Sequence, residues 1–230
     1  MLGVSVAAFP ACDGLFDPYD ALPAEADSGY EQLQVDATTY DDWTYVSLHD
    51  LSKDFVRMPV PMELTGEWDG VTCYTRQEIK LGTTTELSSV PTDAQAEPDE
   101  WDIAIHHFDF RTNGGWSSET SYTSLDQVPD RLADIPGVEW EADQLTTDRV
   151  WVDLTNSLSF DIGCQTIAIS LPLSRMVSMD VSNPPPVYNI SGKVCLLRMS
   201  DDSVAALFLD NYMDAKGQKG HLTISIKPLQ

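Results

Sequence analysis

The feature that most constrains the fold is a series of short runs in which β-branched, aromatic and other apolar residues alternate with polar ones. Gly, Pro, Asn, Asp or Ser bounds each run, and this combination is typical of strands separated by turns. The predicted strands are residues 43–48, 71–81, 102–110, 149–154, 165–171, 193–199, 204–209 and 221–226. Many short strands joined by turns indicate an all-β chain built as an antiparallel sheet or sandwich.

Turn signals and the scarcity of helical periodicity support the same fold class. Residues 113–115, 200–202 and 216–220 combine Gly, Asn, Asp, Ser or Lys between apolar runs, and we expect the chain to reverse at each. Only residues 124–133 and 171–179 are expected to hold a turn or two of helix.

The charge of the chain excludes some classes of partner. There are 37 acidic and 13 basic residues, a formal net charge of −24. A phosphate backbone or an anionic lipid surface would repel such a chain, so we expect no binding to nucleic acid. The charge is typical of a secreted protein that stays in solution. Calcium binding is the alternative, but no loop of the D-x-[DN]-x-[DN]-G type occurs.

The first residues resemble the end of a lipoprotein signal peptide. Residues 1–12 read MLGVSVAAFPAC, an apolar segment with small residues before a cysteine. Cleavage there would leave Cys12 as a lipidated N-terminus. Two features depart from the pattern: Phe9 stands where Leu is usual, and the first basic residue of the chain is Lys53. The alternatives are a signal segment cut short at Met1 and a short apolar strand.

The rest of the chain is expected to form a tether and one folded domain. Residues 13–30 are rich in Asp, Ala, Pro and Gly without periodicity, which is typical of a flexible linker. Residues 31–230 show no internal repeat and no break in composition. No stretch of the sequence is long and apolar enough to span a membrane.

Known catalytic motifs do not occur in the sequence. It contains no G-x-S-x-G, P-loop, G-x-G-x-x-G or H-E-x-x-H. In one continuous strand His106 and His107 would face opposite sides, whereas His107 and Asp109 would share a face and could form a structural hydrogen bond. No C-x-x-C pair supports a zinc site, and Cys195 lies in an apolar run typical of a core. We therefore expect no enzyme, and a hydrolase with a scattered triad is the weakest alternative.

Residues 101–115, WDIAIHHFDFRTNGG, resemble the signature strand and turn of the HmuY-like family. Residues 43–48 resemble the family's N-terminal strand, and residues 186–227 resemble its C-terminal half. The resemblance implies an HmuY-like all-β fold and a lipoprotein of Bacteroidetes, held by a lipid anchor at the outer membrane and facing outwards. It also implies capture of haem or a related porphyrin for iron acquisition, with transfer to an outer-membrane TonB-dependent receptor.

The resemblance places two iron ligands, His or Met, after the signature segment. The first is expected in residues 155–163, which contain neither His nor Met, and the second at Val181 or Pro184, which cannot ligate iron. The nearest substitutes are Met176 and Met179, whose spacing would put both on one face of a helical turn. They are our candidate haem ligands, and the alternative is that both fill gaps in a core.

Other arrangements of a haem site stay open. Cys164 could supply a thiolate, or haem could sit in an apolar pocket lined by Trp116, Trp151 and Phe160. The alternative function is an interaction or adhesion module for protein or glycan that keeps the HmuY-like fold and has lost haem binding.

Overall fold

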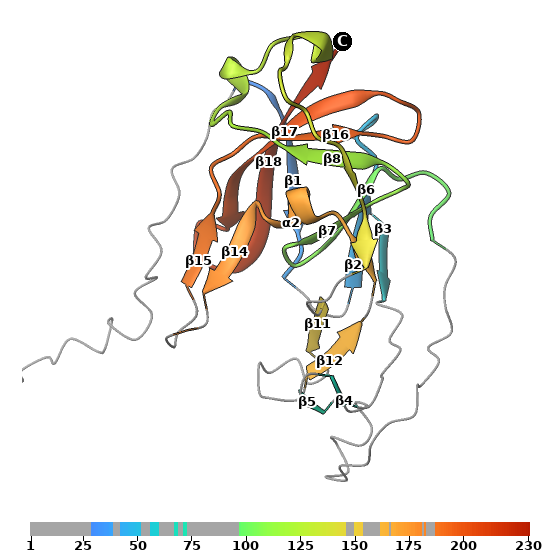
Figure 1. The fold of residues 1–230 in the computed structure, drawn as a ribbon. Coiled ribbons are helices and arrows are strands. Elements are labelled where there is room, and N and C mark those ends of the chain that lie inside the picture. The colour runs from blue at the N-terminus through green and yellow to red at the C-terminus, as the bar shows by residue number, and fades with distance from the viewer. Residues whose placement is uncertain are drawn as a thin grey trace, which may run out of the picture.

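The computed structural model describes most of the folded body in eleven segments. These are residues 29–38, 42–51, 56–59, 67–68, 71–72, 97–145, 150–153, 162–165, 167–180, 182 and 187–230. The strands in them pair antiparallel throughout, with little helix (Figure 1). The prediction of an all-β antiparallel fold is therefore confirmed.

The larger sheet has six strands and contains the two longest strands described. Its order is β1 (Glu31–Asp36), β18 (Lys219–Leu229), β17 (Val204–Met213), β16 (Cys195–Arg198), β8 (Trp116–Glu119) and β9 (Glu141–Ala142). The predicted turn at 200–202 joins β16 to β17, and the one at 216–220 leads from β17 into β18. Both predicted reversals are therefore confirmed, although β17 and β18 extend beyond the predicted runs.

The smaller sheet has four strands. Its order is β3 (Val56–Pro59), β2 (Asp42–Val46), β6 (Ile103–His106) and β7 (Asp109–Thr112). The turn predicted at 113–115 follows β7 and leads to β8, with Gly114 at a φ of +69°. Glycine adopts this left-handed backbone conformation readily because it has no Cβ that would clash.

The prediction of one strand over residues 102–110 is wrong, because the chain turns back within it. His106 pairs with Asp109 across a hairpin whose turn is His107 and Phe108, and His107 has a φ of +55°. Asp109 consequently lies beside His106, with Nδ1 and Oδ2 3.5 Å apart, and the predicted shared face of His107 and Asp109 does not form. The sequence hides this turn because neither residue is a usual turn former.

Four small strand pairs complete the described strands. They are β4 (Glu67–Trp68) with β5 (Val71–Thr72), β10 (Gln144–Leu145) with β13 (Ala168–Ile169), β11 (Val150–Asp153) with β12 (Ile162–Gln165), and β14 (Val177–Asp180) with β15 (Val187–Ile190). The hairpins β11–β12 and β14–β15 lie toward the lower end of the molecule in Figure 1, away from the C-terminus at the top. Of the strand predicted over residues 71–81, only Val71–Thr72 is described.

In the described segments, helix is confined to short turns. Of two 3₁₀ turns, Leu125–Gln127 lies within the predicted segment 124–133, and Leu132–Asp134 ends one residue beyond it. In the segment predicted at 171–179, α2 covers only Leu171–Ser174, and the chain then enters β14. None of the helices in the described segments has the length and hydropathy to cross a membrane.

The main core lies between the two sheets, because both contribute side chains to one buried cluster. The smaller sheet supplies Val46, Ile103, Ile105 and Phe110, and the larger sheet supplies apolar residues from β1, β16, β17 and β18. Each fully buried Leu, Ile or Phe adds about 1.5–3 kcal/mol of hydrophobic stabilisation. Cys195 is one of these core residues, and burial raises the pKa of its thiol to about 12, as expected for an unreactive cysteine.

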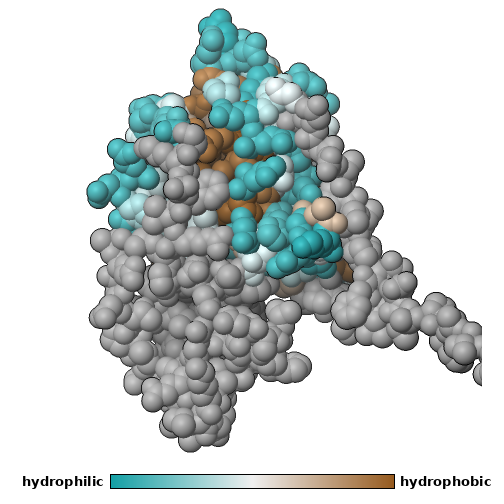
Figure 2. Space-filling model, turned by 180° about the vertical axis from the view of Figure 1, so that it is seen from behind, coloured by the Kyte–Doolittle hydropathy of each residue, from teal (hydrophilic) through white to brown (hydrophobic). Residues whose placement is uncertain are grey.

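A second core covers part of the opposite face of the larger sheet. Leu125, Val128 and Ile135, from the segment with the 3₁₀ turns, pack against Leu196 of β16 and Ala206 of β17. Viewed from behind, hydrophilic residues surround a hydrophobic area on the described surface (Figure 2). Among the described residues, the exposed large hydrophobic side chains are Trp116 and Leu145, with exposed fractions of 41% and 71%.

Charged side chains fix the ends of the signature strands. The Asp102 carboxylate accepts a hydrogen bond from the Leu48 backbone N–H at 2.6 Å. The Arg111 guanidinium donates to Glu97 at 2.6 Å and lies 5.0 Å from the centre of the Trp101 ring. Such contacts join β2, β6 and β7 at their ends and hold the hairpin in register.

Gly220 and Gly114 form a matched pair for testing backbone constraint. Both have positive φ, but a Cβ on Gly220 would lie 2.8 Å from the Thr38 Cα, whereas one on Gly114 would meet nothing within 4 Å. We expect Gly114→Ala to lower the free energy of unfolding by about 1 kcal/mol and Gly220→Ala by about 3 kcal/mol. Urea denaturation measures both, and equal losses would contradict the close approach of β18 to the end of β1.

Burial of His107 should make stability depend on pH. The side chain is 5% exposed, its Nδ1 lies 3.2 Å from the Ala37 carbonyl oxygen, and burial lowers its pKa from 6.5 to about 4. Between these values the unfolded chain binds the proton and the folded chain does not, so stability falls as the pH falls from 6.5 to about 4. The expected loss is about 3 kcal/mol, and below about pH 4 His107 contributes no further change.

The control for this prediction is His107→Asn, because Asn tolerates positive φ and does not titrate. We expect the free energy of unfolding of this variant to vary less between pH 6.5 and 4 than that of the wild type. Urea denaturation at several pH values checks this. Parallel pH profiles would show that His107 is not the group responsible.

Candidate functional site

The hairpins β11–β12 and β14–β15 border the segments in which the resemblance places the iron ligands. Residues 155–161 of the first segment lie outside the described residues, as do Val181 and Pro184 of the second. The described part of the candidate site is therefore the β14–β15 hairpin and the residues packed beneath it.

Met176 and Met179 do not share a helical face. Helix α2 ends at Ser174, Met176 follows in a turn, and Met179 lies in β14 opposite Tyr188 of β15. Met176 is completely buried in the main core, whereas Met179 is half-buried. The helical arrangement expected from their spacing is thus wrong, and the haem-ligand assignment itself stays a prediction.

An aromatic group supports the β14–β15 hairpin. Tyr188 stacks on Tyr212 of β17 with ring centres 5.7 Å apart, and the Tyr212 hydroxyl donates to the Tyr188 carbonyl oxygen at 3.1 Å. Phe108, in the β6–β7 turn, meets the Tyr188 ring edge-on at 5.9 Å. The Lys219 ammonium lies 4.4 Å from the centre of the Tyr188 ring, within cation–π range. These contacts tie the hairpin to both sheets.

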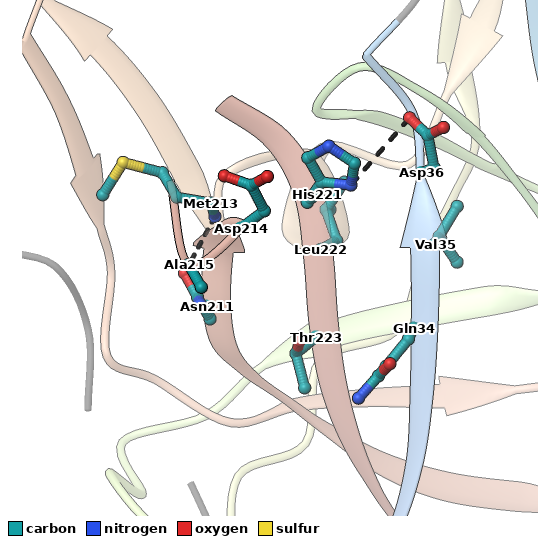
Figure 3. Close-up of a pocket in the computed structure, with 10 residues that line it drawn as sticks. All are labelled: Gln34, Val35, Asp36, Asn211, Met213, Asp214, Ala215, His221, Leu222 and Thr223. Atoms are coloured by element: carbon teal, nitrogen blue, oxygen red, sulfur yellow. Dashed lines mark hydrogen bonds and ion pairs between the residues drawn. The ribbon is translucent and has the colours of Figure 1, made fainter. Parts of the chain in front are cut away.

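A polar groove lies at the same end of the larger sheet. It has a volume of about 620 Å³ and lies between the end of β1, the end of β17 and the start of β18 (Figure 3). Its polar lining consists of Gln34, Asp36, Asn211, Asp214, His221 and Thr223. In Figure 3 the Asp36 and His221 side chains face each other across β1 and β18, with 4.0 Å between Oδ1 and Nδ1.

Of the other candidates, some lie on other strands and some lie outside the described segments. Trp116 is exposed on β8 and stacks on the Arg198 guanidinium at 5.5 Å, with Trp140 at 5.3 Å from the same group. Trp151 lies in β11, and Cys164 in β12. Phe160 and Cys12 lie outside the described residues.

Neither metal-binding nor hydrolytic chemistry gains support from the described residues. No group of three or more His, Cys, Asp or Glu side chains within them is placed to hold a metal ion. His107, which a scattered hydrolytic triad would need in a cleft, is buried instead.

Sequence reasoning missed the groove and the aromatic support of the hairpin. The alternation of residues 31–36 could have indicated a strand with one polar face, since its burial alternates in the structure. The partner strand and its register could not be inferred, because they depend on contacts between β1 and β18, about 190 residues apart by their pairing.

Comparison with known proteins places this chain in a family. The family model described as HmuY protein matches residues 39–225. A search among curated proteins finds no match. A structure from Bacteroides fragilis NCTC 9343, described as a proposed lipoprotein, is 30% identical, with a TM-score of 0.63 and coverage of 89% of this chain and 92% of that one.

Two further structures are similar. One from Bacteroides vulgatus ATCC 8482, described as a proposed HmuY-like heme binding protein, is 27% identical, with a TM-score of 0.65 and coverage of 90% and 97%. An apo HmuY analog from Tannerella forsythia shares the fold at 20% identity, with a TM-score of 0.64 and coverage of 87% and 96%. Because the HmuY family model matches most of its length, the chain belongs to the HmuY family.

Proposed function

We propose that this protein is a non-enzymatic, cell-surface lipoprotein that captures haem or a related porphyrin for iron acquisition. The observation that carries the proposal is the HmuY match over residues 39–225. The Bacteroides vulgatus structure described as heme binding, which covers 90% of this chain, supports the same cargo.

The proposed attachment is a lipid on Cys12, with residues 13–30 as the tether and residues 31–230 as the binding domain. The similar Bacteroides fragilis structure, described as a lipoprotein, supports an anchored form. An outward-facing position on the outer membrane would let the protein meet haem outside the cell. Transfer to a TonB-dependent receptor would follow, because haem is too large to enter unaided.

The β14–β15 hairpin and the residues packed against it offer chemistry that suits a porphyrin. A porphyrin is flat and apolar, and haem carries two propionates. Tyr188 and Phe108 supply aromatic rings, and Lys219 places a cation above Tyr188 that could pair with a propionate. Met179 supplies a thioether, a competent iron ligand, on the same hairpin.

Of the two candidate methionines, Met179 is the better placed. Its half-buried side chain can become part of a ligand site by a small rotation, whereas Met176 would have to leave the main core. We therefore assign Met179 as the proposed iron ligand and treat Met176 as a core residue for the purpose of testing.

The second candidate function is an interaction module that has lost haem binding. The observation that favours it is the sequence of the two ligand segments: residues 155–163 contain no His or Met, and neither Val181 nor Pro184 can ligate iron. The two functions differ in whether hemin binds at all.

A hemin titration followed in the Soret band tests the proposal. The purified domain should bind hemin saturably at micromolar concentration, and absence of a Soret shift would refute haem capture. Met179→Ala should weaken binding about tenfold, or about 1.4 kcal/mol, and alter the Soret band, because the thioether is lost.

Met176→Leu is the matched control, since it keeps the volume of a core side chain and removes the sulfur. It should leave hemin affinity and the Soret band unchanged. If Met176→Leu and Met179→Ala changed the spectrum equally, the assignment of Met179 as the ligand would be wrong.

A further inference from the structure

The polar groove at the end of the larger sheet is built by strand register. Gln34 pairs with Thr223 and Asp36 with His221, so these four side chains project from one face of β1 and β18. Val35 and Leu222 alternate with them and are buried in the main core. The groove is therefore the polar outer face of strands whose inner face is fixed by the core.

Irregular pairing in β17 places a fifth side chain in the groove. The register between β17 and β18 shifts between Leu209 and Asn211, and again between Asn211 and Met213. Such irregularities bend a strand and redirect its side chains. Asn211 lines the groove beside Thr223, and its Oδ1 accepts the Met213 N–H at 2.8 Å, which holds the amide in place (Figure 3).

Several groove side chains keep hydrogen-bonding capacity. Within the described part of the chain, the Gln34 amide and the Thr223 hydroxyl make no hydrogen bond to other protein groups. Asn211 uses its Oδ1 and keeps an NH₂ group that can donate. The two bonds that Asp214 accepts, from the N–H groups of Lys216 and Gln218, both use its Oδ1.

The chemistry of this lining selects a class of ligand. The amides and hydroxyl of the lining can both donate and accept hydrogen bonds, and each carboxylate has two oxygens that accept. This combination suits a ligand with neighbouring hydroxyl groups, because each hydroxyl can donate and accept. Asp36 and Asp214 would repel an anion. No three ligating side chains in the described segments converge to hold a metal. A volume of about 620 Å³ is within the usual range for a small-molecule site.

We propose that this groove binds a neutral, hydroxyl-rich glycan through Gln34, Asn211 and Thr223, with Asp214 as a flanking acceptor. The site is separate from the hemin ligands proposed above, although Leu222 borders both the groove and the aromatic support of the β14–β15 hairpin. The inference does not require that haem binds.

The test uses the full folded chain with mannan, dextran and maltohexaose as probes, measured by isothermal titration calorimetry. At least one probe should bind saturably to the wild type. The double variant Gln34→Ala/Thr223→Val should bind that probe at least tenfold more weakly, because it removes both uncommitted groups while keeping a β-branched residue in β18.

Gln144→Ala is the matched control, because Gln144 is an exposed amide on β10, outside the groove. It should bind the probe as the wild type does, and all variants should keep the wild-type thermal unfolding midpoint and hemin titration. The proposal is overturned if no probe binds or if the double variant binds like the wild type.

Discussion

The packing of two antiparallel sheets against one apolar core is the constraint on which the rest of the structure depends. Ile105 and Phe110, from the smaller sheet, share this core with Leu207 and Ile224 of the larger one. The inward side chain Val177, at the start of β14, belongs to the same cluster. The start of the β14–β15 hairpin therefore packs in the main core, so the contacts that hold the two sheets together also hold the base of this hairpin.

The same constraint explains why polar chemistry gathers at one end of the molecule. Successive side chains along β1 and β18 point to opposite faces of the sheet. Because Val35 and Leu222 pack in the core, their neighbours Asp36 and His221 face outward. In the described part of the chain, the second core covers the outer face of the sheet where the segment with the 3₁₀ turns packs on β16 and β17. Beyond that segment the polar face forms the groove.

Local patterns predicted much of the fold but less of the site. Alternation located β17 and β18, and the glycine-containing turns located the reversals before β8 and β18. The hairpin at His107 escaped detection because its positive φ is imposed by burial against Gly220 and Ala37, not by a turn-forming residue. The prediction that Met176 and Met179 share a helical face was wrong because an i, i+3 spacing implies a shared face only if the helix continues, and α2 ends at Ser174. The register that creates the groove arises from contacts far apart in sequence.

Membership of the HmuY family makes haem the central question for this chain. The most direct measurement is the amount of hemin retained per chain in equilibrium dialysis at micromolar hemin, beside an unrelated acidic protein of similar size. The account predicts that one hemin is retained per chain at saturation. Retention no greater than that of the acidic control would contradict haem capture and favour the interaction module on the same fold.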